Sequence, residues 1–208
     1  MSLYKRLYVN QILYLRGCFM ARKTQISKEV ILENAFQMLL REGYSAINIT
    51  ALSKEIGCST QPIAWHFGNM DGLRAELLTY CLDFLKDFFE TRGDDAVSIL
   101  EEIAEKYINL AIDYPQLYKY IYISEHDGEK MGQIAHFLRA KNQDKILQML
   151  QMEQGISAEQ AGSYMMNLQI YVHGIASFAV TKFTFPSKEV VMHMIHEANQ
   201  AFLKQIKG

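Results

Sequence analysis

Histidine and carboxylate side chains that could bind a metal ion or transfer a proton cluster in two places in the sequence. His193 and His196 lie three residues apart near the C-terminal end, a spacing that puts both imidazoles on one helix face, but no third ligand is evident beside them. A polar loop at residues 126–129 could bind an ion only weakly. The motifs G-x-S-x-G and H-E-x-x-H and a phosphate-cradling glycine loop are absent from the sequence. We therefore expect no metal site, no cofactor and no enzymatic activity.

The distribution of charge points to a different chemistry. The 208 residues include 21 Lys and Arg against 23 Asp and Glu, for a net charge of −2. Six of the basic residues and none of the acidic ones precede Glu29, which leaves 15 basic against 23 acidic residues beyond. A concentrated positive charge can bind phosphates even in a weakly acidic protein. The basic residues of this segment are Lys5, Arg6, Arg16, Arg22, Lys23 and Lys28.

The N-terminal segment begins like a secretory signal, with basic residues followed by an apolar stretch. Asn10, Gln11 and Arg16 interrupt that stretch, and no cleavage site of the A-x-A type follows. Two interpretations stay open: an extension upstream of a start at Met20, or a short amphipathic helix. We treat residues 1–22 as a basic N-terminal extension.

Composition favours an all-helical protein in a reducing compartment. Half of the residues are hydrophobic and only three are proline, so long stretches contain no residue that stops a helix. The three cysteines are an odd number and form no C-x-x-C pair, which argues against a disulfide framework or a zinc ribbon. We expect a cytoplasmic protein with no membrane span and about nine helices.

Caps and turn glycines predict three short helices at the start of the chain. Ser27 caps the first, which Gly43 ends; Asn48 caps the second, which Gly57 ends in a left-handed turn; Ser59 caps the third. The remaining predicted helices cover residues 71–93, 95–113, 115–124, 128–151, 157–183 and 187–204.

The second and third predicted helices, NITALSKEIGCSTQPIAWHF at residues 48–67, have the form of a helix-turn-helix. An α-helix fits the major groove of DNA, where each base pair shows a distinct pattern of donors and acceptors. Helical hairpins of this spacing also occur as plain packing units. The segment 31–73 contains I-L-x-x-A-F-x-x-L-x-x-E-G-Y, L-S-x-E-I-G-C-S and W-H-F-x-N-x-x-x-L, and it resembles the DNA-binding domain of the tetracycline-repressor (TetR) family.

That resemblance implies roles for individual residues. Asn48 corresponds to a family threonine that caps the second helix and touches a phosphate, and Gln61 is the best candidate to bind an adenine edge. Trp65 corresponds to an aromatic residue that contacts the DNA backbone, although it could instead pack against the first helix. The predicted DNA-contacting residues are Lys28, Asn48, Thr50, Thr60, Gln61, Pro62, Trp65, His66 and Asn69.

Two positions depart from the family pattern. Ala64 stands where the family usually has a tyrosine, and Met70 where it usually has a phosphate-binding lysine. The basic residues before Glu29, in particular Arg22, Lys23 and Lys28, would then supply phosphate affinity in their place. These departures also motivate an alternative function, a helical small-molecule-binding protein that has lost sequence-specific DNA binding.

The second half of the chain is rich in aromatic and sulfur-containing residues. Such residues fill cores, and they also line ligand sites. The stretch YPQLY at residues 114–118 resembles the joint that borders the effector pocket of TetR-family regulators. The candidate ligand-binding residues are Tyr107, Tyr118, Tyr122, Phe137, Met166 and His173. Because we identify no charged residue among them, we expect a largely apolar or aromatic effector.

The segment 164–180 is apolar on more than one face, so one face can pack on the core and another on a partner. In the family, the last two long helices pair across a two-fold axis, which here implies a homodimer through residues 157–183 and 187–204. The resemblance implies a helix-turn-helix domain at 23–72 and a ligand-binding and dimerisation domain at 73–208. The implied function is a ligand-responsive repressor that binds a palindromic, double-stranded DNA operator and is released by a small effector.

Overall fold

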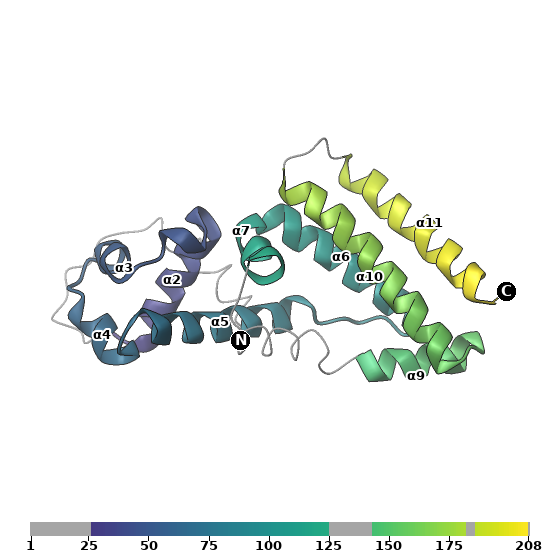
Figure 1. Ribbon diagram of the computed structural model, residues 1–208, viewed down its shortest axis with the longest axis horizontal. Coiled ribbons are helices and arrows are strands. Elements are labelled where there is room, and N and C mark those ends of the chain that lie inside the picture. Colours follow the sequence, from purple (N-terminus) through teal and green to yellow (C-terminus); the bar gives the residue numbers. More distant parts are fainter. Residues whose placement is uncertain (1–25, 125–142, 182–185, 208) are drawn as a thin grey trace. The chain divides into compact units, whose positions relative to one another are not determined.

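The computed structural model describes residues 26–124, 143–181 and 186–207, and these residues contain nine α-helices and no β-strand. The predicted all-α class is therefore confirmed (Figure 1). The described residues form two compact units, of which the first contains α2 to α5 and the second contains α6 to α11. The N-terminal extension and most of the predicted helix at 128–151 lie outside the described residues.

The first unit is a small helical bundle. It consists of α2 (Lys28–Glu42), the 3-10 turn η1 (Tyr44–Ala46), α3 (Ile49–Ile56), α4 (Gln61–Phe67) and α5 (Met70–Phe88). One apolar face of each α-helix meets in the core, where the largest side chains are Phe36 and Phe84, with ring centroids 5.1 Å apart. Burial of such faces from water is what holds short helices together.

Two of the three predicted caps are confirmed. The hydroxyl oxygen of Ser27 accepts a hydrogen bond from the Val30 amide at 3.4 Å. The side-chain oxygen of Asn48 accepts one from the Ala51 amide at 2.8 Å. The third prediction was wrong, because α4 begins after Thr60, whose backbone is already helical and whose side chain makes no capping bond.

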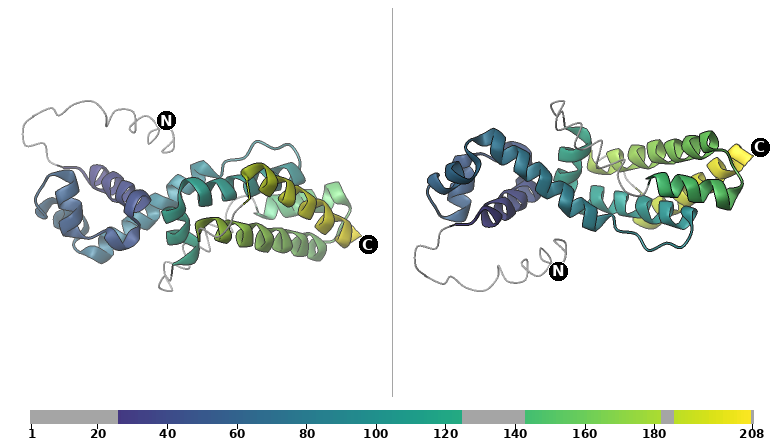
Figure 2. Two further views of the ribbon diagram at one scale, coloured as in Figure 1. Left: turned by 90° about the horizontal axis from the view of Figure 1, so that it is seen from above. Right: turned by 90° about the horizontal axis from the view of Figure 1, so that it is seen from below.

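The second unit is built around α10 (Ala158–Val180), which packs against α6 (Ala96–Asp113), α9 (Gln143–Gln154) and α11 (Lys188–Lys207). Two short elements follow α6: α7 (Pro115–Tyr118) and a single π-helical turn η2 (Lys119–Ile123). Both views of Figure 2 show α10, in green, lying beside the yellow α11.

Capping boxes start two of the long helices of this unit. Asp95 and Ser98 exchange side-chain and backbone hydrogen bonds before α6, and Ser157 and Gln160 do the same before α10. Each box satisfies two amides that a helix start otherwise leaves unpaired. The sequence placed both of these helix starts correctly.

The predicted helix at 71–93 ends earlier than expected, at Phe88. The backbone beyond it is held by α6 instead: the Arg92 amide donates to a Glu102 carboxylate oxygen at 2.9 Å. A Cβ at Gly93 would lie 2.9 Å from the Ile99 amide nitrogen, so only glycine fits against the start of α6 there.

A buried polar network joins three helices of the second unit. Asn199 of α11 is 1% exposed; its side-chain oxygen accepts from the Tyr164 hydroxyl of α10, and its amide donates to Glu101 of α6 at 2.9 Å. Burial raises the pKa of Tyr164 to about 12, so the hydroxyl keeps its proton as a donor. His196 also contacts the Glu101 carboxylate, at 2.9 Å.

Among the helices in the described ranges, none is long and apolar enough to cross a membrane.

Candidate nucleic-acid interface and ligand site

The turn between α3 and α4 has the geometry of a helix-turn-helix. Gly57 ends α3 in the left-handed conformation, with φ of 76° and ψ of 33°, and the Cys58 amide closes the turn on the Ser53 carbonyl at 2.9 Å. A residue with a Cβ is strained at this backbone conformation. Pro62 lies in the first turn of α4, where a helix loses no hydrogen bond by lacking an amide donor.

The end of α4 is fixed by an unusually tight turn. Gly68 has φ of 72° and ψ of −61°, and the Asn69 amide donates to the Phe67 carbonyl at 2.8 Å, which is a γ-turn. The Asn69 side-chain oxygen then accepts from the amides of Asp71 and Gly72, at 2.9 and 3.0 Å, and so starts α5. A Cβ at Gly72 would lie 2.1 Å from the Phe67 carbonyl oxygen. Glycine is therefore required where α5 crosses the end of α4.

The helix α4 buries one face and exposes the other. Ile63 and Phe67 are buried in the bundle, whereas Gln61 and Ala64 are exposed and Trp65 is 69% exposed. The interpretation in which Trp65 packs in the core is therefore wrong. Tryptophan is enriched at interfaces, because its ring provides apolar contact area and its N–H can donate a hydrogen bond to a partner.

Asn48, the N-cap of α3, belongs to the same helix-turn-helix as α4. The capping part of the role predicted for Asn48 is confirmed. Its amide nitrogen also lies 3.4 Å from the Ala46 carbonyl oxygen. Thr50 is exposed in the first turn of α3, and Thr60 is exposed just before α4. Contact of these residues with DNA stays a prediction.

Besides Asn48 and Asn69, two more of the predicted DNA-contacting residues make contacts within the protein. The Lys28 ammonium pairs with Glu76 of α5 at 2.6 Å and lies 5.8 Å from the centroid of the Phe67 ring. His66 Nε2 lies 2.9 Å from the backbone oxygen of Ile26. All three contacts join residues at least 39 positions apart, so no local sequence pattern indicates them.

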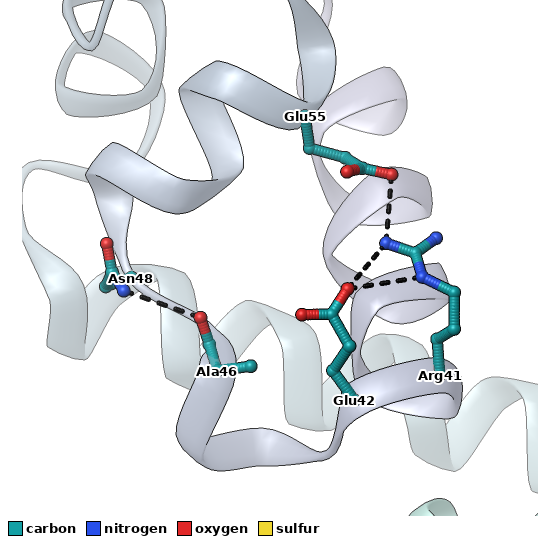
Figure 3. A network of polar contacts seen from close by, with 5 residues as sticks. All are labelled: Arg41, Glu42, Ala46, Asn48 and Glu55. Atoms are coloured by element: carbon teal, nitrogen blue, oxygen red, sulfur yellow. Dashed lines mark hydrogen bonds and ion pairs between the residues drawn. The ribbon is translucent and has the colours of Figure 1, made fainter.

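A surface ion-pair network links α2 and α3. The Arg41 guanidinium near the end of α2 reaches Glu42 at 2.8 Å and Glu55 of α3 at 3.1 Å (Figure 3). The side chains are partly exposed, so each pair contributes little to stability. The network links the last turn of α2 to the last turn of α3.

The second candidate site is a cluster of rings between α6, α7, η2 and α10, which we call the tyrosine–histidine cluster: Tyr107, Tyr118, Tyr122 and His173. Its three phenol rings meet with centroids 4.9 to 5.5 Å apart. The hydroxyls of Tyr107 and Tyr118 lie 2.7 and 3.0 Å from the same nitrogen, Nδ1 of His173. Four of the six residues predicted to bind a ligand are thus brought together.

The polar tips of this cluster converge, and its phenols are neutral. Burial raises the pKa of Tyr107, Tyr118 and Tyr122, so each phenol keeps its proton at neutral pH. Ser177, one turn beyond His173, places its hydroxyl 3.4 Å from that of Tyr118. Sequence reasoning did not assign Ser177 to this site, although its i+4 spacing from His173 was the available signal.

The other two predicted ligand residues are not part of the cluster. Met166 is 56% exposed on α10, two turns before His173. Phe137 lies outside the described residues. Met166 belongs instead to an exposed apolar stripe on the last two helices: Met166, Ile170 and Phe178 of α10 with Val190 and Met194 of α11.

The C-terminal histidines are bound to carboxylates on the surface. His196 contacts Glu101, and His193 lies 3.4 Å from Glu197 within α11. In the part of the chain that the structure describes, no three His, Cys, Asp or Glu side chains are grouped so as to hold a metal ion.

The fold is that of TetR-family transcriptional regulators. A Rhodococcus protein assigned to that family superposes with a TM-score of 0.60 and 17% identity, covering 84% of this chain and 97% of its own. The Q116A variant of TetR from Acinetobacter baumannii AYE, solved with minocycline, gives a TM-score of 0.55 at 14% identity, covering 88% and 97%. The resemblance inferred from the sequence is therefore confirmed at the level of the fold.

A curated relative points in the same direction. The HTH-type transcriptional regulator YobS of Bacillus subtilis, itself uncharacterized, is 27% identical over 113 residues, which is 52% of this chain and 58% of YobS. The match therefore spans little more than half the length of that relative. No protein-family model matches the chain.

Proposed function

We propose that this chain is a ligand-responsive transcriptional regulator that acts as a repressor and binds a palindromic operator as a homodimer. The observation that carries the proposal is the exposed face of α4, where Trp65 is 69% exposed beside Gln61 and Ala64. The helix α4 follows a left-handed glycine turn, and its first turn contains side chains able to bind base edges and phosphates. In this proposal Gln61 binds a base edge, and Asn48, Thr50 and Trp65 contact the DNA backbone.

The exposed apolar stripe of α10 and α11 supports the dimer. Its five members are large hydrophobic side chains that a monomer would leave in water. A two-fold interface formed by these helices would cover the stripe with the same stripe of a second copy. Two recognition helices about 34 Å apart would then bind successive major grooves of one operator.

The tyrosine–histidine cluster supports an effector site in the second unit. Two phenol hydroxyls, one imidazole and the Ser177 hydroxyl point toward one another within an apolar, aromatic surrounding. A neutral aromatic ligand with an oxygen or nitrogen acceptor matches these groups, since each hydroxyl can turn from its internal partner to the ligand. Binding would favour a conformation in which the two recognition helices no longer match the operator spacing, and DNA affinity would fall by the ligand's differential affinity for the two conformations.

Gel retardation of the DNA upstream of the protein's own gene tests this function. We expect salt-sensitive, sequence-dependent binding, and Gln61→Ala should reduce discrimination among base substitutions by ~1–3 kcal/mol. Gln148→Ala, which removes an exposed glutamine of α9, is the matched control and should bind as the native chain does. Equal affinity for the upstream fragment and an unrelated duplex would contradict the proposal.

A second candidate is a helical small-molecule-binding protein that no longer binds a specific sequence. The observation that favours it is the state of Lys28, whose charge is already paired with Glu76, together with Ala64 and Met70 at positions where the family has a tyrosine and a lysine. In that case Gln61→Ala would change neither DNA affinity nor base discrimination.

A further inference from the structure

The helix-turn-helix, residues 48–69, contains a single Lys or Arg side chain. That residue is Lys54 of α3, and the next residue, Glu55, is the one Asp or Glu of the motif. The helix α4 has no Lys or Arg, and its His66 is already in contact with the backbone oxygen of Ile26 at 2.9 Å. Affinity for DNA depends largely on cations placed against phosphates. Lys54 is therefore the cation of this motif to consider for such a contact.

The acidic neighbour of Lys54 is paired elsewhere. One carboxylate oxygen of Glu55 lies 3.1 Å from the Arg41 guanidinium of α2, and Figure 3 shows the Glu55 side chain turned toward Arg41. None of the residues three or four positions from Lys54 is acidic, and these are the positions whose side chains meet along a helix. The α3 helix thus offers the Lys54 ammonium no carboxylate that would compete with a phosphate.

The other basic side chains of α2 to α5 divide into paired and unpaired ones. Lys28, Arg41 and Arg74 each pair with a carboxylate, at 2.6, 2.8 and 3.1 Å. Within the described residues, Lys54 and Lys86 are exposed and make no ion pair. Lys86 lies in the last turn of α5, about 24 Å along that helix from its start beside α4. Lys54 is thus the unpaired cation of the motif itself.

The side chain of Lys54 shares a face of α3 with another group that can bind phosphate. Thr50 precedes it by four residues, and both side chains are exposed, whereas Leu52 and Ser53 between them are buried. An ammonium and a hydroxyl both donate hydrogen bonds, and a phosphate oxygen accepts them. The Lys54 carbonyl accepts from the Gly57 amide at 3.2 Å, so its backbone belongs to the ordered turn that leads into α4.

We propose that Lys54 binds a DNA phosphate beside the half-site that α4 occupies, on the same face of α3 as the Thr50 hydroxyl. The inference rests on the proposed DNA binding and names a residue that the sequence comparison with the TetR family did not single out. It supplies within the motif the phosphate affinity that Met70 does not. It also explains why the pairing of Lys28 with Glu76 need not abolish DNA binding.

The salt dependence of DNA binding by the full-length protein tests this role. Lys54→Gln removes the charge, and Lys54→Arg keeps it. The matched control is Lys86→Gln, because it makes the same change at an exposed, unpaired lysine of the same unit. Each protein is titrated with the upstream duplex and with an unrelated duplex at several salt concentrations, because a phosphate contact does not require a specific sequence.

We expect Lys54→Gln to weaken binding of both duplexes by a similar factor. It should reduce the steepness of log affinity against log salt by about 0.9 for each bound chain. Between 50 and 200 mM salt, the native protein should therefore lose roughly 3.5-fold more affinity per bound chain than Lys54→Gln does. Lys54→Arg and Lys86→Gln should keep the native slope. Circular dichroism checks that each variant is folded, and Lys54→Met provides a second neutral variant at the same position.

A native salt slope for both Lys54→Gln and Lys54→Met would overturn the inference. Loss of slope in Lys54→Arg would also contradict it, because the charge would then not be what binds. A loss confined to the upstream duplex would assign Lys54 to a base instead of a phosphate. Failure of the native protein to bind either duplex is a separate result, because it contradicts the proposed function before any variant is compared.

Discussion

The two units use aromatic side chains that carry a polar group in opposite ways. In the first unit, Trp65 is 69% exposed on the outer face of α4. In the second unit, Tyr118 is fully buried, and its hydroxyl is bonded to His173 and lies within reach of Ser177. An exposed indole can hydrogen-bond to water or to a partner molecule, whereas a buried phenol must find its hydrogen-bond partner inside the chain. The proposed DNA contact therefore uses an exposed side chain of the first unit, whereas the proposed effector site uses buried polar groups of the second unit.

The largest expected effect comes from removing a ring from the tyrosine–histidine cluster. Tyr118→Ala should lower the free energy of unfolding by ~3–5 kcal/mol, because the substitution leaves a cavity between Tyr107, Tyr122 and His173. Tyr118→Phe, which keeps the ring, should cost only about 1 kcal/mol. Urea unfolding followed by circular dichroism measures both. Equal losses for the two variants would show that the hydroxyl, not the packing, holds the cluster.

A buried phenol also depends on its hydrogen-bond acceptor. Asn199→Leu should lower the free energy of unfolding by ~1–3 kcal/mol, because it leaves the Tyr164 hydroxyl without its acceptor and removes one of the two side chains that contact the Glu101 carboxylate, leaving only His196. Combining it with Tyr164→Phe should recover part of the loss, since no orphaned hydroxyl remains. If the double variant is no more stable than Asn199→Leu alone, the Tyr164 hydroxyl does not need that partner.

Alkaline pH should destabilise the fold through its buried tyrosines. Burial raises the pKa of Tyr107, Tyr122 and Tyr164 above the ordinary value of 10.0, so these phenols ionise more readily in the unfolded chain. Above pH 10 the unfolded state binds fewer protons than the folded one, and stability falls as pH rises. We expect the free energy of unfolding to decline only above pH 10. The absorbance of phenolate at 295 nm should rise at a higher pH in the folded protein than in the unfolded chain. A full phenolate signal near pH 10 from a folded protein would contradict the burial of the cluster.

The smallest effect on stability is expected at the exposed indole. Trp65→Ala should change the free energy of unfolding by less than about 0.5 kcal/mol, because the side chain buries little surface in the bundle. The same substitution should weaken DNA binding clearly, which no loss of fold would explain. A stability loss comparable with that of Tyr118→Ala would mean that Trp65 supports the bundle after all.

Local patterns were sufficient to predict most helix ends, because the caps at Ser27 and Asn48 and the turn at Gly57 make hydrogen bonds to residues at most four positions away. The contacts of Lys28 and His66 could not be predicted in this way, since Glu76 and Ile26 are distant in sequence and reach them only through the packing of the bundle. Several residues of the tyrosine–histidine cluster were found from composition and from the resemblance to a known joint.

Other expectations failed for identifiable reasons. Met166 and His173 share a helix face by their seven-residue spacing, but two turns of α10 separate them, and the cluster packs only against the later turn. Ser59 and Thr60 are equally suitable caps by residue type, and the backbone of Thr60 is already helical, so neither type nor spacing shows where α4 begins.

The single tryptophan allows the most direct test of the central claim, that the exposed face of α4 binds DNA. Because Trp65 is the sole indole in the chain and lies on that face, its emission reports on the recognition helix in the native protein, without substitution or label. Titration with the upstream duplex should quench and shift the emission at stoichiometric DNA, and added salt should reverse the change. Unchanged emission while the duplex is bound would contradict the claim, because DNA would then bind elsewhere on the protein.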